Sequence, residues 1–200
     1  MRQRYFFSHN EEHLNTQYCI TRLNGSLFGQ TQYYYQMTKK LLIIRHAKSD
    51  WDSSVLKDFD RPLNKRGEKN APEMAERLVK KNLIPNQLVS SPALRAITTA
   101  GYFADVFNIK KSEIRKEQHI YEASSKTLLQ IINQFDNQFN FIALFGHNPG
   151  LTELVINLCN ADLYDIPTCG MVMIEFPFKD WSMISYESNF RRRYLLRNCF

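Results

Sequence analysis

The sequence lacks the features that would place it in a membrane or in an oxidising compartment. No apolar run approaches the roughly 20 residues of a membrane-spanning helix, and residues 1–15 lack the apolar core of a signal peptide. The four cysteines are far apart and form no C-x-x-C pair: Cys19, Cys159, Cys169 and Cys199. This spacing argues against a structural zinc site and favours a reducing compartment. We therefore expect a cytoplasmic protein that contacts no membrane.

A strongly basic face is also missing from the body of the chain. The formal net charge is +6, but the segment 190–200 alone holds four arginines and no acid. Residues 1–36 carry +1, which leaves +1 for residues 37–189. A protein that binds nucleic acid needs a basic face on its folded body, so we expect no nucleic-acid partner. The basic C-terminal tail is expected to be solvated.

Composition divides the chain into three parts. Residues 1–36 are rich in Gln, Asn, Tyr and Ser and show no sustained period of 2 or 3.6. They are interpreted either as a disordered extension or as the result of a misassigned start, with Met37 as the true first residue. Residues 37–189 are expected to form the folded domain and residues 190–200 the tail. A chain of 200 residues suits one such domain, which we expect to be a monomer.

Strand and helix patterns alternate from Met37 onward. Short apolar or alternating runs predict strands within residues 41–45, 86–91, 112–121, 139–146, 171–176 and 181–187. Apolar residues at helical spacing predict helices over residues 64–82, 91–106, 124–135 and 151–159, with Asn64 and Ser91 as N-caps and Pro92 in the first helical position. The alternation predicts a three-layer α/β/α fold around a doubly wound, mostly parallel sheet.

Three of the predicted strands end abruptly in polar residues. Arg45 and His46 follow the first strand, Arg95 lies early in the helix after "LVSS", and His147 follows "FIALFG". In open α/β sheets, ligands bind beyond the carboxyl ends of the strands. Bringing two arginines and two histidines to one such edge is costly unless an anion binds there. The pattern therefore predicts an anion-binding crevice.

Four motifs in this order resemble the histidine phosphatase superfamily, which has the phosphoglycerate-mutase-like fold. They are "RHAKSDW", "DFDRPLNKRG", "SSPALRAITTA" and "FGHNPGL", within a resemblance that spans residues 39–187. Within the superfamily, the chain resembles the branch of small SixA-type phosphohistidine phosphatases. Ala47 stands where much of the superfamily has glycine, but "RHA" is common in the SixA branch. The resemblance implies a metal-independent phosphatase without a cofactor, whose substrate is phosphohistidine on a partner protein.

The resemblance also implies roles for the four residues at the sheet edge. His46 would attack phosphorus and form a phosphohistidine intermediate, as a neutral imidazole can do near pH 7. Arg45 and Arg95 would hold phosphoryl oxygens with their planar forks. His147 would be protonated and would clamp a further oxygen.

The general acid for the leaving group is harder to assign. Motif order favours Glu122 in "HIYEAS", with Asp60 in "DFDRPL" as the second candidate. Asp60 could instead be structural and pair with Arg61 or Arg66. Further candidates for substrate binding are Lys48, Ser49 and Asn148.

Other functions fit parts of the pattern. A metal-dependent hydrolase could use His46, His147 and His119 with Asp50 or Asp58 as ligands, although two arginines beside such a site would repel a cation. A second alternative is a non-catalytic module that binds phosphoproteins, although all four core residues expected of an active enzyme are present.

A phosphatase of small phosphate esters, such as sugar phosphates, is the third alternative. It would share the core chemistry and differ in the pocket walls, which are expected within residues 50–60, 119–126 and 161–169. The chain has no insertion long enough to form a lid, so the sequence favours a shallow, open mouth that can admit a phosphorylated side chain on a protein surface.

Overall fold

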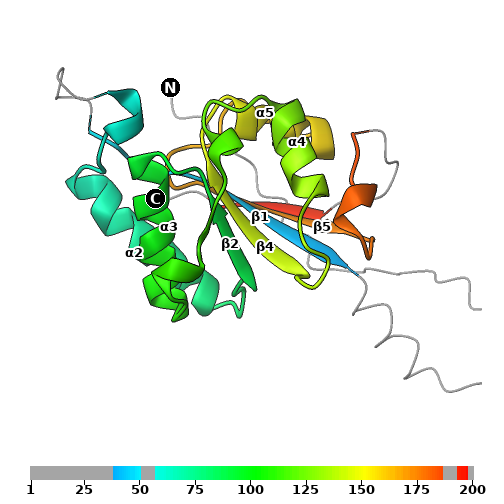
Figure 1. The fold of residues 1–200 in the computed structure, drawn as a ribbon, viewed down its shortest axis with the longest axis horizontal. Coiled ribbons are helices and arrows are strands. Elements are labelled where there is room, and N and C mark those ends of the chain that lie inside the picture. The colour runs from blue at the N-terminus through cyan, green and yellow to red at the C-terminus, as the bar shows by residue number, and fades with distance from the viewer. Residues whose placement is uncertain (1–37, 51–56, 187–192, 198–200) are drawn as a thin grey trace, which may run out of the picture.

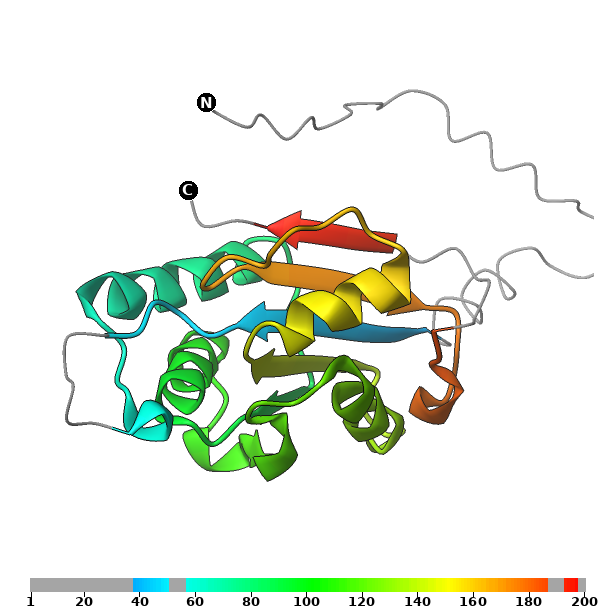
Figure 2. The same cartoon turned by 90° about the horizontal axis from the view of Figure 1, so that it is seen from above.

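The computed structural model describes residues 38–50, 57–186 and 193–197. The predictions for residues 1–36 lie outside this part of the chain. A six-stranded sheet with the order β3-β2-β4-β1-β5-β6 forms the middle of the molecule (Figures 1 and 2). The strands are β1 (Lys39–Arg45), β2 (Gln87–Ser90), β3 (Arg115–Lys116), β4 (Phe141–Gly146), β5 (Met171–Phe176) and β6 (Arg193–Arg197). The pairs β1–β4, β2–β4 and β2–β3 are parallel, whereas β5 and β6 are antiparallel to their neighbours.

Helices cover both faces of this sheet. They are α2 (Lys65–Val79), α3 (Leu94–Phe107), α4 (Ser125–Asn133) and α5 (Gly150–Cys159), with 3-10 turns η1 (Asp58–Asp60), η2 (Lys111–Glu113), η3 (Gln118–Ile120) and η4 (Trp181–Met183). Figure 1 shows α2 and α3 on one side and α4 and α5 on the other. The three-layer, mostly parallel α/β prediction is confirmed.

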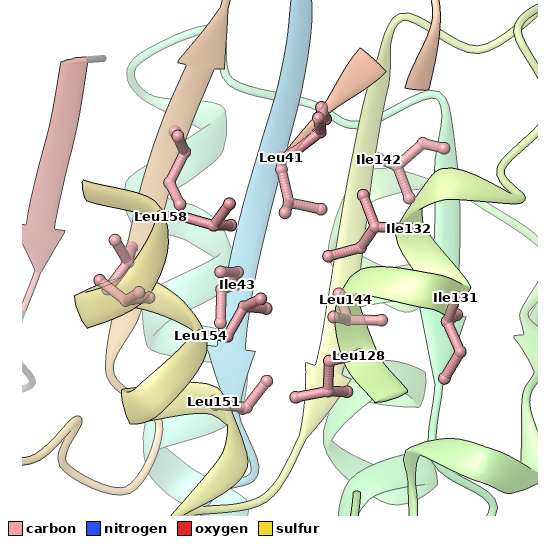
Figure 3. Packing of buried hydrophobic residues seen from close by; sticks show 14 of the residues in the cluster. Leu41, Ile43, Leu128, Ile131, Ile132, Ile142, Leu144, Leu151, Leu154 and Leu158 are labelled. Atoms are coloured by element: carbon pink, nitrogen blue, oxygen red, sulfur yellow. The ribbon is translucent and has the colours of Figure 1, made fainter. Parts of the chain in front are cut away.

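Alternation along the buried strands divides the core into two clusters. Leu41 and Ile43 of β1 pack with leucines and isoleucines of α4 and α5 (Figure 3), whereas Leu42 and Ile44 pack toward α2 and α3. Both faces of β1 are therefore buried, as expected for a central strand in a parallel sheet. Among the described helices, none combines the length and apolarity needed to cross a bilayer.

The N-caps explain where two helices begin. The Asn64 side chain accepts a hydrogen bond from the backbone N–H of Gly67 at 3.0 Å, as predicted. Ser124 caps α4 in the same way through the N–H of Thr127 at 3.2 Å. The prediction for α3 was wrong by two residues, because α3 begins at Leu94 rather than at Pro92.

Two predictions near the C-terminus need correction. No strand forms over residues 181–186; these residues instead contain η4, whose Trp181 is fully buried. The carbonyl oxygens of Trp181 and Ile184 accept hydrogen bonds from the Asn133 side chain at 2.8 and 2.9 Å. The segment predicted to be a solvated tail contains β6, which extends the sheet along β5.

Candidate active site

The carboxyl ends of β1, β2 and β4 meet at a cleft of about 710 Å³. Eight of the nine residues proposed from the sequence line it: Arg45, His46, Lys48, Ser49, Arg95, Glu122, His147 and Asn148. The ninth, Asp60, is exposed and does not line the cleft. Asp58, two residues earlier, takes that place.

His46 is buried and has a defined hydrogen-bonding arrangement. Its Nδ1 lies 2.8 Å from the carbonyl oxygen of Ala47, which can only accept. Nδ1 therefore carries the proton, and Nε2 keeps a lone pair that accepts a hydrogen bond from Arg95 Nε at 3.3 Å. Burial, with smaller contributions from the charges of Arg95 and Arg45, lowers the pKa of His46 to about 4. The imidazole is neutral near pH 7, as a nucleophile must be.

A single threonine ties the end of β1 to α3. The hydroxyl of Thr99 accepts from the backbone N–H of Ala47 at 3.0 Å and donates to the carbonyl of Arg95 at 2.7 Å. Thr99 and Ala47 are both fully buried. This bridge fixes the residue after His46 relative to the first turn of α3, which carries Arg95.

Asp58 holds the outer end of the Arg95 guanidinium. Arg95 donates to the backbone oxygen of Asp58 at 2.5 Å and to its carboxylate at 2.9 Å. The same carboxylate pairs with Arg61 at 2.7 Å and accepts from the Tyr121 hydroxyl at 2.9 Å. Partial burial alone would raise the pKa of Asp58, but the Tyr121 hydrogen bond and the Arg95 charge lower it. Asp58 is therefore an anion that orients Arg95.

Arg45 is held from the loop before β5. Its guanidinium donates to the Asp165 carboxylate at 2.8 Å and to the Ile166 carbonyl at 2.6 Å. The Asn148 side chain donates to the same two groups. The Nε of Arg45 is buried without a hydrogen-bond partner among the described residues. Asp165 was not proposed from the sequence, since no motif marked it.

His147 lies beside His46, with the two ring centroids 5.2 Å apart. Its Nε2 is 2.9 Å from the Ser91 hydroxyl, and its Nδ1 is buried without a hydrogen-bond partner in the described part of the chain. Burial, followed by the nearby His46 and Arg95, lowers the pKa of His147 to about 3. A pKa of about 3 favours the neutral ring in the ligand-free site, and the protonated form expected with a bound phosphoryl group stays a prediction. A phosphoryl anion beside the ring would raise this pKa.

The remaining candidates differ in how they are held. Ser49 is buried and accepts from Arg61 at 3.1 Å, so its hydroxyl is part of the Asp58 network. Glu122 is exposed on the opposite wall and has a φ of 53°, in the left-handed region that is uncommon for glutamate. Such backbone conformations are frequent at functional sites.

Of the metal ligands considered from the sequence, His46, His147 and Asp58 line the cleft but His119 does not. His119 is exposed and pairs with Glu117 at 2.9 Å. Within the described residues, no group of three or more His, Cys, Asp or Glu side chains could hold a metal ion.

Comparisons with known proteins agree with this geometry. Residues 41–149 match the family model of the histidine phosphatase superfamily, branch 1. The chain is 28% identical over 153 residues to an uncharacterized chloroplastic protein of Arabidopsis thaliana, a match that covers 72% of this chain and 70% of that protein. It is 29% identical to a 2,3-bisphosphoglycerate-dependent phosphoglycerate mutase of Arthrobacter, over 51% of this chain but 44% of the mutase.

Solved structures extend the similarity to SixA proteins. SixA of Agrobacterium tumefaciens superposes with a TM-score of 0.63 at 27% identity and covers 68% of this chain and 90% of its own. The protein histidine phosphatase SixA in complex with tungstate has a TM-score of 0.57 at 22% identity, covering 68% and 86%. At that identity, the second similarity shows the fold alone.

Proposed function

The chain belongs to the histidine phosphatase superfamily, and we propose that it is a phosphatase that removes phosphate from phosphohistidine on a partner protein. The observation that carries this proposal is the state of His46. Its proton sits on Nδ1, its Nε2 lone pair faces Arg95, and its pKa is lowered to about 4. These are the properties of a nucleophile that is ready near pH 7.

The first chemical step forms a covalent intermediate. As phosphorus approaches, phosphoryl oxygens replace Nε2 as the acceptor of the Arg95 Nε–H. The Nε2 lone pair then makes the bond to phosphorus, and the bond to the leaving group breaks with its electron pair. Donors on Arg45, Arg95 and His147 stabilise the charge on the phosphoryl oxygens. The leaving atom takes a proton from water or from Glu122, which lines the cleft.

The second step restores the enzyme. A water molecule attacks phosphorus, the bond between phosphorus and Nε2 breaks, and the electron pair returns to Nε2. The protons of the water leave on the phosphate product, as dihydrogen phosphate, and equilibrate with the solvent. The proton stays on Nδ1 and remains hydrogen-bonded to the Ala47 carbonyl throughout, which keeps the ring orientation fixed between the steps. No step needs a metal ion or a cofactor, so we propose metal-independent hydrolysis.

The choice of phosphohistidine rests on the leaving group and on the similarity to SixA proteins. An imidazole leaves more readily than an alkoxide, so it demands less of an acid. Glu122 is exposed on the wall of the cleft. A phosphorylated side chain on a protein surface is therefore the better match to these groups.

Hydrolysis of small phosphate esters is the second candidate. A cleft of about 710 Å³ is within the size range of small-molecule sites, so its volume does not support the shallow mouth expected from the sequence. The match to phosphoglycerate mutases also favours this candidate. Each of the three segments predicted to form the pocket walls contributes to the lining of the cleft, through Asp58, Glu122 and Thr168.

A direct comparison of substrates tests the proposal. kcat/KM is measured, with EDTA and no added metal, for a phosphohistidine-bearing phosphotransfer domain and for a panel of small phosphomonoesters. We expect the phosphohistidine protein to be the better substrate and vanadate to inhibit competitively, because the arginines favour a trigonal-bipyramidal oxyanion. A sugar phosphate that is better by about tenfold, a difference of about 1.4 kcal/mol, would favour the ester phosphatase instead. A requirement for zinc would contradict the metal-free mechanism.

A further inference from the structure

The two walls of the cleft carry different charges. Lys48, Arg61 and Asp58 line the wall formed by the described part of the connection from β1 to α2, with two cations and one carboxylate. Glu122 and Glu153 line the opposite wall, which is formed by the connection from η3 to α4 and by the first turns of α5.

Close packing holds the two glutamates on the same wall. A Cβ atom at Gly150 would lie 2.0 Å from the carbonyl oxygen of Ala123, so the backbone after Glu122 lies directly against the start of α5. Glu153 follows Gly150 by three residues, which is the spacing of one helix face. Figure 1 shows α4 and α5 side by side over one face of the sheet.

The charges of the cleft nearly cancel before any ligand binds. Its lining has four permanently charged cations, Arg45, Lys48, Arg61 and Arg95, and three carboxylates, Asp58, Glu122 and Glu153. A further carboxylate, Asp165, pairs with Arg45. The lowered pKa values leave His46 and His147 neutral. A phosphoryl dianion therefore makes the occupied cleft negative, and a second anionic group on the substrate would meet repulsion from the glutamate wall.

The same cleft contains a buried ring nitrogen that is available to bind a ligand. His147 is 9% exposed, and its buried Nδ1 has no hydrogen-bond partner among the described residues. The phosphoryl group is expected on this side, beside His46. The part of the substrate that leaves then extends toward the mouth, where the glutamates lie.

We propose that Glu122 and Glu153 determine specificity, by favouring substrates with a positive charge beside the phosphoryl group and disfavouring substrates with a carboxylate there. The favoured class includes phosphoryl groups on protonated imidazole, amine or guanidine nitrogens, and esters with an ammonium group. The inference rests on the proposed phosphatase function. It also gives a physical reason why a phosphoglycerate, despite the mutase relatives, would be a poor substrate.

Three small esters isolate the effect of charge from that of the bond being broken. Phosphoethanolamine, glycerol 3-phosphate and 3-phosphoglycerate are all esters of small alcohols, and their other groups are cationic, neutral and anionic at pH 7. We expect kcat/KM to fall in this order, with a ratio of about tenfold or more between the first and the last, given what exposed ion pairs contribute. The ratio should shrink in 1 M NaCl, because screening weakens exposed charges.

Substitutions assign the effect to the wall. Glu153→Gln should lower the ratio of phosphoethanolamine to 3-phosphoglycerate by up to about fivefold, which corresponds to about 1 kcal/mol. Glu122→Gln should lower it similarly, even if loss of an acid also slows all three esters together. Glu113→Gln, on η2 and outside the lining, is the matched control and should leave the ratio unchanged.

The possible outcomes distinguish the role of the two glutamates from the proposed phosphatase function. Hydrolysis with no preference among the three esters, or a preference that neither substitution nor salt changes, would overturn the role of the wall and leave the phosphatase intact. Failure to hydrolyse any of them, or p-nitrophenyl phosphate, or a phosphohistidine protein, would overturn the proposed function and this inference with it. A role of Glu153 limited to stabilising the N-terminus of α5 would appear as a lower unfolding free energy with an unchanged ratio.

Discussion

At the scale of single residues, the orientation of Arg95 depends on an aspartate that belongs to another element. All three side-chain nitrogens of Arg95 donate hydrogen bonds. Nε donates to His46, and the two terminal nitrogens donate to the backbone oxygen and the carboxylate of Asp58. Arg95 is 5% exposed, so it has few other partners available. Of its five N–H groups, Asp58 accepts two and His46 accepts one, which leaves two for phosphoryl oxygens. Asp58 thus acts on the reaction through Arg95.

A pair of isosteric substitutions tests this role. Asp58→Asn should lower kcat/KM by about tenfold to a hundredfold, because a hydrogen bond to a charged group contributes about 1.5–3 kcal/mol. Asp60→Asn, on the same 3-10 turn but exposed and outside the cleft, should have little effect. Steady-state kinetics and vanadate inhibition constants measure both. Equal losses in the two variants would contradict the assignment and favour Asp60 as the acid.

The sequence predicted the arginines and histidines at the strand ends better than the carboxylates that pair with the arginines. Arg45 ends the strand β1, and His46 and His147 directly follow β1 and β4, so the topology alone places them at the carboxyl edge. Asp58 and Asp165 reach the site from loops, whose positions depend on tertiary packing. The three-residue spacing of Asp58 and Arg61 was a signal that could have identified the first of them.

At the scale of elements, the site depends on close contact between the loop that carries Glu122 and the start of α5. Gly150 permits this contact, since a side chain there would collide with a backbone oxygen rather than with a flexible side chain. Gly101, in the middle of α3, has different surroundings. An added Cβ would approach nothing nearer than the Lys111 side chain, at 3.5 Å.

Replacing each glycine by alanine therefore has opposite expected results. Gly150→Ala should destabilise the fold by about 1–3 kcal/mol, as overpacking does, and should reduce activity by displacing the wall of the cleft. Gly101→Ala should stabilise by about 0.5–1 kcal/mol, because alanine suits a helix interior better. Chemical unfolding and kcat/KM are the measurements. A Gly150→Ala protein as stable and active as the wild type would show that the contact is not needed.

The start of a helix was predictable where the capping side chain forms no competing hydrogen bond. Asn64 caps α2 as its sequence suggests. The Ser91 hydroxyl accepts from the N–H of Ala93 at 3.3 Å and contacts His147, so α3 begins further along the chain. The alternating pattern of residues 181–187 suggested a strand. Instead of pairing with a strand, the backbone of Trp181 forms hydrogen bonds with the side chains of Asn133 and Asn137.

At the scale of the whole molecule, the fold is the consequence of an alternating pattern that can be read from the sequence. Both faces of the central strands are apolar, and each helix has one apolar face, so a three-layer arrangement follows. The edge strand β6 was missed because its arginine-rich segment resembles a solvated tail, and only pairing with β5 distinguishes the two. The fold also buries two neutral histidines, which links its stability to pH.

Stability should fall as the pH falls below about 6.5, the ordinary pKa of histidine. The unfolded chain takes up protons there, whereas burial lowers the folded-state pKa values of His46 and His147 to about 4 and about 3. Between pH 6.5 and 5 the unfolding free energy should therefore decrease by up to about 1.4 kcal/mol per pH unit for each histidine. His147→Gln should reduce this slope. Urea unfolding at several pH values measures it, and a slope near zero would contradict neutral burial.

The central claim is that His46 becomes covalently phosphorylated, and trapping the intermediate tests this most directly. Protein mixed with a phosphorus-labelled substrate is quenched within milliseconds to seconds and mapped by mass spectrometry under alkaline conditions. We expect a label on His46 that is lost in acid, and no label and essentially no turnover in a folded His46→Ala variant. A label on serine that is stable to acid, or undiminished turnover by His46→Ala, would contradict it.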